Sequence, residues 1–255
     1  PFIVQDSVEI AYNGNSTKVH LQAYGQNAHF LHNHIITADE VWAADKPYVI
    51  TGGLRVAQDA QLTIGKGVRI YMHAAAPFIV DGTLKVEGEA APEDNVVFAG
   101  DRLDEPYKWH PAGWPGIVFT GNSSGNSIRF AQIKNAYNAL FLHEPAHTAT
   151  PVLTLQQTVI DNAFEGGITA IGSSIDAQNV VVSNCGKNIV IQKGGTYNFT
   201  HCTIAAYSNS FIQHKQPLVL LSNFFEKDNV VTTKGLNILF RNTILWGESG
   251  GLVKD

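Results

Sequence analysis

The densest group of side chains that could carry out chemistry lies in residues 100–114, which read GDRLDEPYKWHPAGW. Carboxylates and imidazoles can exchange protons with a substrate or bind a metal ion. This segment supplies four of them: Asp101, Asp104, Glu105 and His110. We treat Asp101, Asp104 and His110 as candidate catalytic residues. The alternative is that Asp101 and Arg102 form an ion pair with each other or cap a turn.

The same segment carries aromatic side chains that could stack on the apolar C–H faces of sugar rings. Tyr107, Trp109 and Trp114 are the candidates, and Arg102 completes this candidate ligand-binding set. In the alternative interpretation the tryptophans only cover the side of the scaffold. Residues 100–114 interrupt the repeat described below, so we expect them to protrude as a loop, where functional groups are common.

A second group of candidate ligands is the histidine motif H-x-x-H-x-H, formed by His29, His32 and His34. Side chains two residues apart share a face of a β-strand, so His32 and His34 could together bind zinc or copper. Asp39 or Glu40 could supply a third ligand. The alternative is that these histidines are solvated near an exposed end of the fold. The sequence predicts no other cofactor.

The composition argues against several classes of protein. The chain has 255 residues and a formal net charge of −5, and it contains no run of Lys or Arg. Nucleic acid is therefore not an expected partner, because phosphate binding requires clustered basic residues. Cys185 and Cys202 do not form a C-x-x-C pair, which favours two small buried thiols, with a single disulfide as the alternative. No apolar run is long enough to span a membrane.

A repeating scaffold is expected to position these side chains. The stretches Leu153–Ile160, Ile175–Val182 and Tyr197–Ile204 align without gaps at intervals of 22 residues. Each alternates apolar and polar residues, which indicates a strand with one buried face. No amphipathic helix pattern longer than about two turns lies between them. A sheet joined by helical crossovers is therefore not expected.

This pattern predicts an all-β fold, a right-handed parallel β-helix whose rungs of ~22 residues stack on one another. Leu153, Ile175 and Tyr197 should then share one internal column. Residues 46–255 are expected to form this β-helix. Residues 1–45 lack its cadence and are expected to form a small N-terminal β cap, or the end of a preceding domain.

Two smaller features refine this prediction. A polar corner between strands repeats an asparagine at Asn135, Asn162 and Asn184. Stacked amides of this kind can hydrogen-bond from rung to rung. Leu252 and Val253 read like the start of a further repeat, so we expect the β-helix to be truncated at its C-terminus.

Several stretches of the chain, spread over roughly residues 40–250, resemble one group of proteins. They are Val41–Ile50, Leu62–Ile70, Ile79–Leu84, Val97–Asp104, Trp114–Ile117 and Phe240–Gly247. Together they resemble uncharacterised extracytoplasmic right-handed parallel β-helix repeat proteins of the lipoprotein type, from Bacteroidetes-like bacteria. The resemblance implies the fold and a location at the cell surface, the outer membrane or the periplasm. It implies contact with a membrane only through a lipid anchor outside this fragment, and it carries over no catalytic residues.

The pectin-cleaving enzymes that share this predicted fold have signatures that the chain lacks. Polygalacturonases carry Asn-Thr-Asp, Asp-Asp, Gly-His-Gly and Arg-x-Lys motifs, and none of these occurs. Pectate lyases bind Ca²⁺ on clustered acidic residues, whereas the acids of the regular repeats lie at scattered positions. These acids are Glu144, Asp161, Glu165, Asp176, Glu226 and Asp228. The sequence therefore leans away from an enzyme of either kind.

Three functions remain open. The sequence favours a non-enzymatic surface or periplasmic scaffold that binds a polysaccharide or another cell-surface glycan on its flank. A divergent polysaccharide lyase or glycoside hydrolase, with its site near residues 101–114, is the first alternative. The second alternative is a structural spacer or adhesion segment of a larger surface protein.

Overall fold

Strands dominate the structure, a computed structural model that describes residues 2–25, 27–146 and 151–248. Strands make up 57% of it and helices 3%. The helices found in these ranges are two short 3₁₀ turns, η1 (Pro92–Asp94) and η2 (Tyr107–Trp109). No helix among these residues is long and apolar enough to cross a membrane. The prediction of an all-β protein is confirmed.

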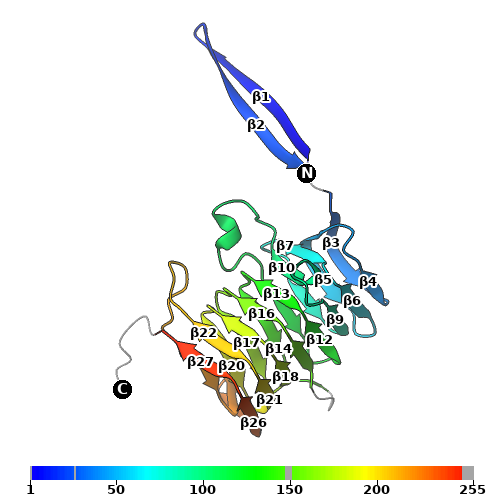
Figure 1. Ribbon diagram of the computed structural model, residues 1–255, viewed down its shortest axis with the longest axis vertical. Helices are drawn as coiled ribbons and strands as arrows, with labels where there is room; N and C mark the ends of the chain where they lie inside the picture. The colour runs from blue at the N-terminus through cyan, green and yellow to red at the C-terminus, as the bar shows by residue number, and fades with distance from the viewer. Residues whose placement is uncertain (1, 26, 147–150, 249–255) are drawn as a thin grey trace.

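Two long parallel sheets contain most of the strands (Figure 1). The smaller sheet has eight strands, and the larger has 15. The larger sheet divides into two arms at the long strand β5 (Tyr48–Val56). Residues 48–50 of this strand pair with β7, and residues 54–56 pair with β8. The structure therefore presents three strand faces: the smaller sheet and the two arms.

The bounds of the strands are as follows. The smaller sheet contains β4 (Glu40–Trp42), β6 (Gln61–Gly65), β9 (Thr83–Glu87), β12 (Asn126–Arg129), β15 (Leu153–Gln156), β18 (Ser174–Gln178), β21 (Gly195–Thr200) and β26 (Leu236–Arg241). The first arm contains β7 (Arg69–Met72), β10 (Val96–Gly100), β13 (Ala131–Lys134), β16 (Val159–Asp161), β19 (Val181–Ser183), β22 (Thr203–Ala206) and β27 (Ile244–Gly247). The second arm contains β8 (Phe78–Val80), β11 (Ile117–Phe119), β14 (Asn138–Leu142), β17 (Gly166–Ile171), β20 (Lys187–Gln192) and β23 (Val219–Leu221), and β3 (His29–Ile36) pairs with β5.

Through the middle of the chain, each strand pairs with the strand three places before it and three places after it. In the smaller sheet, β15 pairs with β12 and β18, and β18 pairs with β21. The register places Leu153 beside Ile175, and Ile175 beside Tyr197, and all three side chains are buried. The predicted internal column is confirmed. Along β15, buried and half-buried residues alternate, as expected for a strand with one face toward a core.

The corners between the faces depend on residues in the left-handed region of backbone conformation. Asn135, Asn162 and Asn184 have φ values of 59°, 57° and 50°, a conformation that asparagine tolerates better than most residues. The side-chain amide Nδ2 of Asn162 donates to Oδ1 of Asn135 at 2.8 Å, so this step of the predicted ladder is confirmed. Asn184 instead donates to the carboxylate of Asp161 at 3.3 Å.

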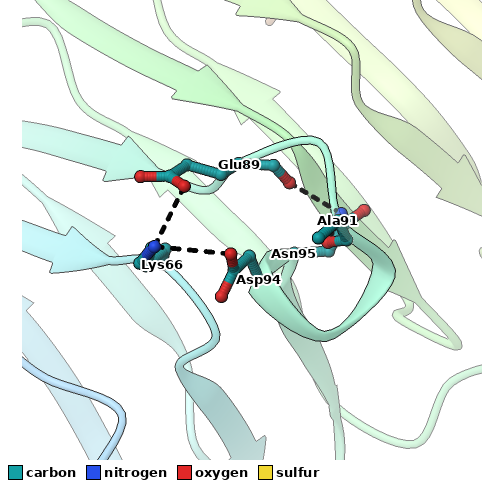
Figure 2. A network of polar contacts seen from close by, with 5 residues as sticks. All are labelled: Lys66, Glu89, Ala91, Asp94 and Asn95. Carbon is teal, nitrogen blue, oxygen red and sulfur yellow. Dashed lines mark hydrogen bonds and ion pairs between the residues drawn. The ribbon is translucent and has the colours of Figure 1, made fainter.

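An ion-pair network fixes one of the longer turns, residues 88–95, against its neighbour (Figure 2). Nζ of Lys66 lies 3.0 Å from Oε2 of Glu89 and 3.4 Å from Oδ2 of Asp94. The side chain of Asn95 donates to the carbonyls of Glu89 and Ala91. This turn contains η1, and η1 contributes Pro92 to the pocket described below.

The N-terminal hairpin projects away from the two long sheets (Figure 1). Its strands β1 (Phe2–Tyr12) and β2 (Asn15–Gly25) pair only with each other among the described residues. Several apolar side chains on it are about half exposed: Val4, Val8, Ile10, Val19 and Leu21. β3 and β4 lie within residues 1–45 as well, and they pair in parallel with β5 and β6. The assignment of residues 1–45 to a cap or to a preceding domain stays a prediction.

The C-terminal part of the described chain completes the sheets. β26 and β27 pair in parallel with β21 and β22. A second antiparallel hairpin is formed by β24 (Phe224–Lys227) and β25 (Val230–Thr233). Leu252 and Val253, which suggested a further repeat, lie outside the described residues.

Both cysteines are buried and free. The prediction of two small buried thiols is therefore confirmed, and the disulfide alternative is wrong. Burial raises the pKa of the Cys185 thiol to about 12, and it raises the pKa of Cys202 as well. The uncharged thiol is thus the stable form of each.

Candidate functional site

Residues 101–116 leave the first arm after β10 and return to the second arm at β11, and they form a protruding loop that includes η2 (Figure 1). The asparagine corners fasten this loop to the scaffold. Nδ2 of Asn135 donates to the carbonyl of Lys108 at 2.7 Å, and Nδ2 of Asn162 donates to the carbonyl of Trp109 at 3.0 Å. The backbone N–H of Gly113 also donates to the carbonyl of Asn135 at 2.8 Å. The loop is therefore held at its tip and at its end.

A pocket of about 230 Å³ lies between this loop and the first arm. The arm supplies the floor of the pocket through outward-facing residues of β7, β10 and β13. These are Arg69, Tyr71, Val97, Ala99, Gln132 and Lys134. The loop supplies the opposite wall, with Arg102, Leu103, Tyr107, Lys108, Trp109 and His110.

The exposed aromatic rings of the loop stand at this pocket. The side chain of Trp109 is 61% exposed and that of Tyr107 is 47% exposed. The guanidinium carbon of Arg102 lies 4.0 Å from the centre of the Tyr107 ring, and Nζ of Lys108 lies 4.8 Å from the centre of the Trp109 ring. Cation–π contacts of this kind orient both partners. Three predicted ligand-binding residues, Arg102, Tyr107 and Trp109, thus line one pocket.

Trp114 does not belong to this set. Its side chain is fully buried, and its Nε1 donates to the backbone carbonyl of Lys134 at 2.9 Å. A ring in this position cannot contact a ligand at the surface. The prediction that Trp114 binds a ligand is wrong, and the alternative, that it packs against the scaffold, is correct for this residue.

The charged residues of the loop pair differently from the ion pair between Asp101 and Arg102 that was the alternative interpretation. Arg102 makes two hydrogen bonds of 2.8 Å to the carboxylate of Asp104, and Lys108 lies 2.6 Å from Oε1 of Glu105. The bond from Arg102 lowers the pKa of Asp104 and raises that of Arg102. The alternative ion pair between Asp101 and Arg102 is therefore not formed, because the guanidinium binds the Asp104 carboxylate with two of its nitrogens.

Asp101 pairs with a histidine that the sequence gave no reason to select. Its Oδ2 lies 2.7 Å from Nδ1 of His73, which follows β7, and the His73 side chain is about half exposed. Its other oxygen, Oδ1, is buried without a hydrogen-bond partner among the described residues. A carboxylate that holds one nitrogen of an exposed imidazole leaves the other nitrogen free to exchange protons.

The three candidate catalytic residues do not form one catalytic group. Asp101 is bound to His73, and Asp104 is bound to Arg102. The His110 ring packs against the rings of Tyr107 and Phe211, with centroids 5.3 and 4.5 Å apart. In the part of the chain that the structure describes, no hydrogen bond or ion pair joins any two of Asp101, Asp104 and His110.

The histidine motif is split by an irregularity in β3. The register shifts between His32, which pairs with Thr51, and His34, which pairs with the buried Leu54. Asn33, between them, has a left-handed φ of 46° and opposes two residues of β5, Gly52 and Gly53, so the strict alternation of faces fails at this point. The prediction that His32 and His34 share a face is therefore wrong.

Each histidine of the motif has its own partner. His29 lies 2.9 Å from Asp45, His34 lies 3.4 Å from Glu40, and Nδ1 of His32 lies 3.0 Å from the hydroxyl of Thr51. Among residues 2–25, 27–146 and 151–248, no group of three or more His, Cys, Asp or Glu side chains could hold a metal ion. The candidate metal site at His29, His32 and His34 is not formed.

Two cationic residues of the pocket floor, Arg69 and Lys134, were missed by sequence reasoning. The alternation within β7 and β13 places both side chains on the outer face, but their common pocket depends on which strands stack.

Comparison with protein-family models, with curated proteins and with solved structures gave no match.

Proposed function

We propose that the two parallel sheets form one right-handed parallel β-helix of the extracytoplasmic lipoprotein type. The recurrence of pairing at every third strand supports a coiled path with three strands in each turn. Right-handed crossovers between parallel strands are strongly preferred in proteins, which supports the handedness. The stretches that resemble Bacteroidetes-like extracytoplasmic proteins support a location at the cell surface or in the periplasm.

Within that class, the chain acts as a non-enzymatic scaffold that binds a glycan on its flank. One observation carries this proposal: Trp109 and Tyr107 expose their rings at the mouth of a pocket while Asn135 and Asn162 hold the loop that bears them. Aromatic faces held in place lose little conformational entropy when a sugar ring stacks on them. The pocket also offers polar groups that can orient the sugar hydroxyls, such as Gln132.

A test of this function is binding to an array of polysaccharides and surface glycans, with the wild-type chain and a Trp109→Ala variant. The expected result is binding that falls roughly tenfold on loss of the ring, since stacked aromatic contacts contribute about 1 kcal/mol or more. Phe30→Ala is the matched control, because Phe30 is exposed on β3, outside the loop and the pocket. Binding that is equal in all three proteins would contradict the proposal.

The His73–Asp101 pair favours an enzymatic function as the second candidate. An exposed imidazole held by a carboxylate could serve as a general base in a divergent polysaccharide lyase or hydrolase. The same glycans should then release unsaturated or reducing sugars on incubation with the chain, and His73→Gln should stop the release. Binding without any such product supports the non-enzymatic scaffold, and neither binding nor product supports a structural spacer.

A further inference from the structure

The charge of the pocket is opposite in sign to that of the whole chain. The formal net charge is −5, yet the residues that line the pocket include four cations and no carboxylate. The cations are Arg69, Arg102, Lys108 and Lys134. Low-dielectric walls concentrate the field of such groups, so the pocket attracts anions even though the protein as a whole is acidic.

Two of these cations are already neutralised within the loop. Arg102 is bound to Asp104 and Lys108 to Glu105, with both carboxylates on the loop itself. Their charges therefore add little net attraction for an anionic ligand. Their cationic groups serve mainly to orient the rings of Tyr107 and Trp109.

The other two cations have no ion-pair partner in the part of the chain that the structure describes. Arg69 is exposed, and Lys134 is half-buried. The acid closest to Lys134 in the strand register is Asp161 on β16. Its Oδ1 accepts hydrogen bonds from Ser183 at 2.6 Å and from Asn184 at 3.3 Å, so part of its charge is already bound elsewhere.

The floor between Arg69 and Lys134 has room for a group that both can reach. The strand between them, β10, presents only Val97 and Ala99 to the pocket, followed by Gly100. β7 and β13 lie two strand spacings apart, and Lys134 stands two residues further along the strands than Arg69, so their Cα atoms are about 12 Å apart. Arginine and lysine have long side chains that can close on one acidic group over such a floor.

We propose that the glycan bound here is an acidic saccharide, whose carboxylate or sulfate group lies between Arg69 and Lys134 while its ring stacks on Trp109. This inference rests on the proposed glycan-binding function and adds the chemical class of the ligand. Charge-assisted hydrogen bonds from guanidinium and ammonium groups to an anion are stronger than those between neutral groups. The acid group therefore provides the selectivity, and the aromatic ring provides contact area.

The test compares acidic polysaccharides with neutral counterparts of identical linkage. Uronate-containing polysaccharides are measured before and after carboxyl reduction, and sulfated polysaccharides before and after desulfation, by calorimetry with the full chain. The expected result is roughly tenfold weaker binding after the acid group is removed, and a similar loss on Arg69→Gln or Lys134→Gln. Arg129→Gln is the matched control, because Arg129 is an exposed arginine on β12, in the other sheet.

The outcomes separate this inference from the function on which it rests. Binding that survives carboxyl reduction and desulfation, and that depends on Trp109 but not on Arg69 or Lys134, overturns the acidic ligand and leaves glycan binding intact. No binding of any glycan, acidic or neutral, overturns both. Loss on carboxyl reduction identifies the acid as a uronate, and loss on desulfation identifies it as a sulfate ester. Both of these results support the proposal.

Discussion

The tethers of the loop predict a specific effect of one small substitution, Asn162→Gly. The side chain of Asn162 donates to the carbonyl of Trp109 at 3.0 Å and to Oδ1 of Asn135 at 2.8 Å. Its backbone φ of 57° is one that glycine adopts freely, so the change removes the amide without straining the corner. The substitution therefore tests the tether and not the fold.

Only the bond from Asn162 to the Trp109 carbonyl joins the loop to the scaffold, because the bond to Asn135 joins two corners and persists when the loop opens. Its net contribution to holding the loop closed is about 0.5–1.5 kcal/mol. Its loss should raise the population of open loop roughly 2- to 13-fold. The thermal stability of the whole chain should change little, because the core residues beneath the corner are untouched.

Limited trypsin digestion measures this opening, because Arg102 and Lys108 both lie in the loop. When opening is fast relative to cleavage, the cutting rate follows the open population. Cleavage after Lys108, identified by mass spectrometry, should be faster in Asn162→Gly than in the wild type. Asn179→Gly is the matched control, since Asn179 has a φ of 54° at a corner without loop contacts. Equal cleavage rates in all three proteins would refute the tether.

Three further predictions concern stability and reactivity. Trp114→Ala should lower the free energy of unfolding by about 3–5 kcal/mol in urea titrations, because the ring is fully buried. Trp109→Ala should change the free energy of unfolding by less than about 0.5 kcal/mol. Similar losses in both variants would contradict the different placement of the two rings. Desolvation lowers the pKa of His143 below its ordinary value of 6.5 in the folded chain, so the unfolded chain binds more protons and stability should fall as the pH drops below about 6.5. Melting temperatures across this range should decline less in His143→Gln, and an unchanged pH dependence would count against the burial of that imidazole. Cys185 and Cys202 should be inert to thiol reagents in the folded protein at neutral pH and reactive after denaturation, since burial raises both pKa values; rapid labelling of the native chain would show that the thiols are accessible.

The stacking of the strands could be predicted from the sequence because two independent patterns agree. Apolar residues alternate within each repeat, and the repeats recur at a constant interval, so the side chains that share a phase must share a column. The register of Leu153, Ile175 and Tyr197 confirms this. The asparagine ladder was predictable only in part. At Asn184 a nearby carboxylate, Asp161, takes the amide hydrogen bond, and a charged acceptor is the stronger one.

The details of the candidate site could not be read from local patterns. Trp109 and Trp114 look alike in the sequence, but Trp114 pairs with Ala136, packs in the core and donates its Nε1 hydrogen bond to the Lys134 carbonyl, whereas Trp109 is exposed. The pairing of Asp101 with His73 crosses 28 residues, so no motif joins them. The pocket that unites Arg69 with Lys134 likewise requires the three-dimensional order β7, β10 and β13.

The left-handed residue Asn33 is the clearest failure of the alternation rule. A strand pattern assigns faces by counting residues, and the count holds only while the backbone stays extended, which a φ of 46° ends. His32 and His34 were expected on one face and lie on two. Asparagine is one of the residues that favours such a conformation, but the chain has many asparagines, and the sequence alone does not show which of them bends a strand.

The loop of residues 101–116 lies at a corner of the fold, between β10 and β11. The residues that could contact a ligand are therefore separate from the strands that hold the fold together. β10 keeps its pairing with both β7 and β13 even though a long segment follows it. Exchange of residues 102–111 alone would therefore give the flank a new set of contacting side chains and leave the pairing of β10 with β7 and β13 in place. A single residue added inside a strand would instead turn the rest of that strand inside out. Diversification of ligands in proteins built in this way should concentrate at corners.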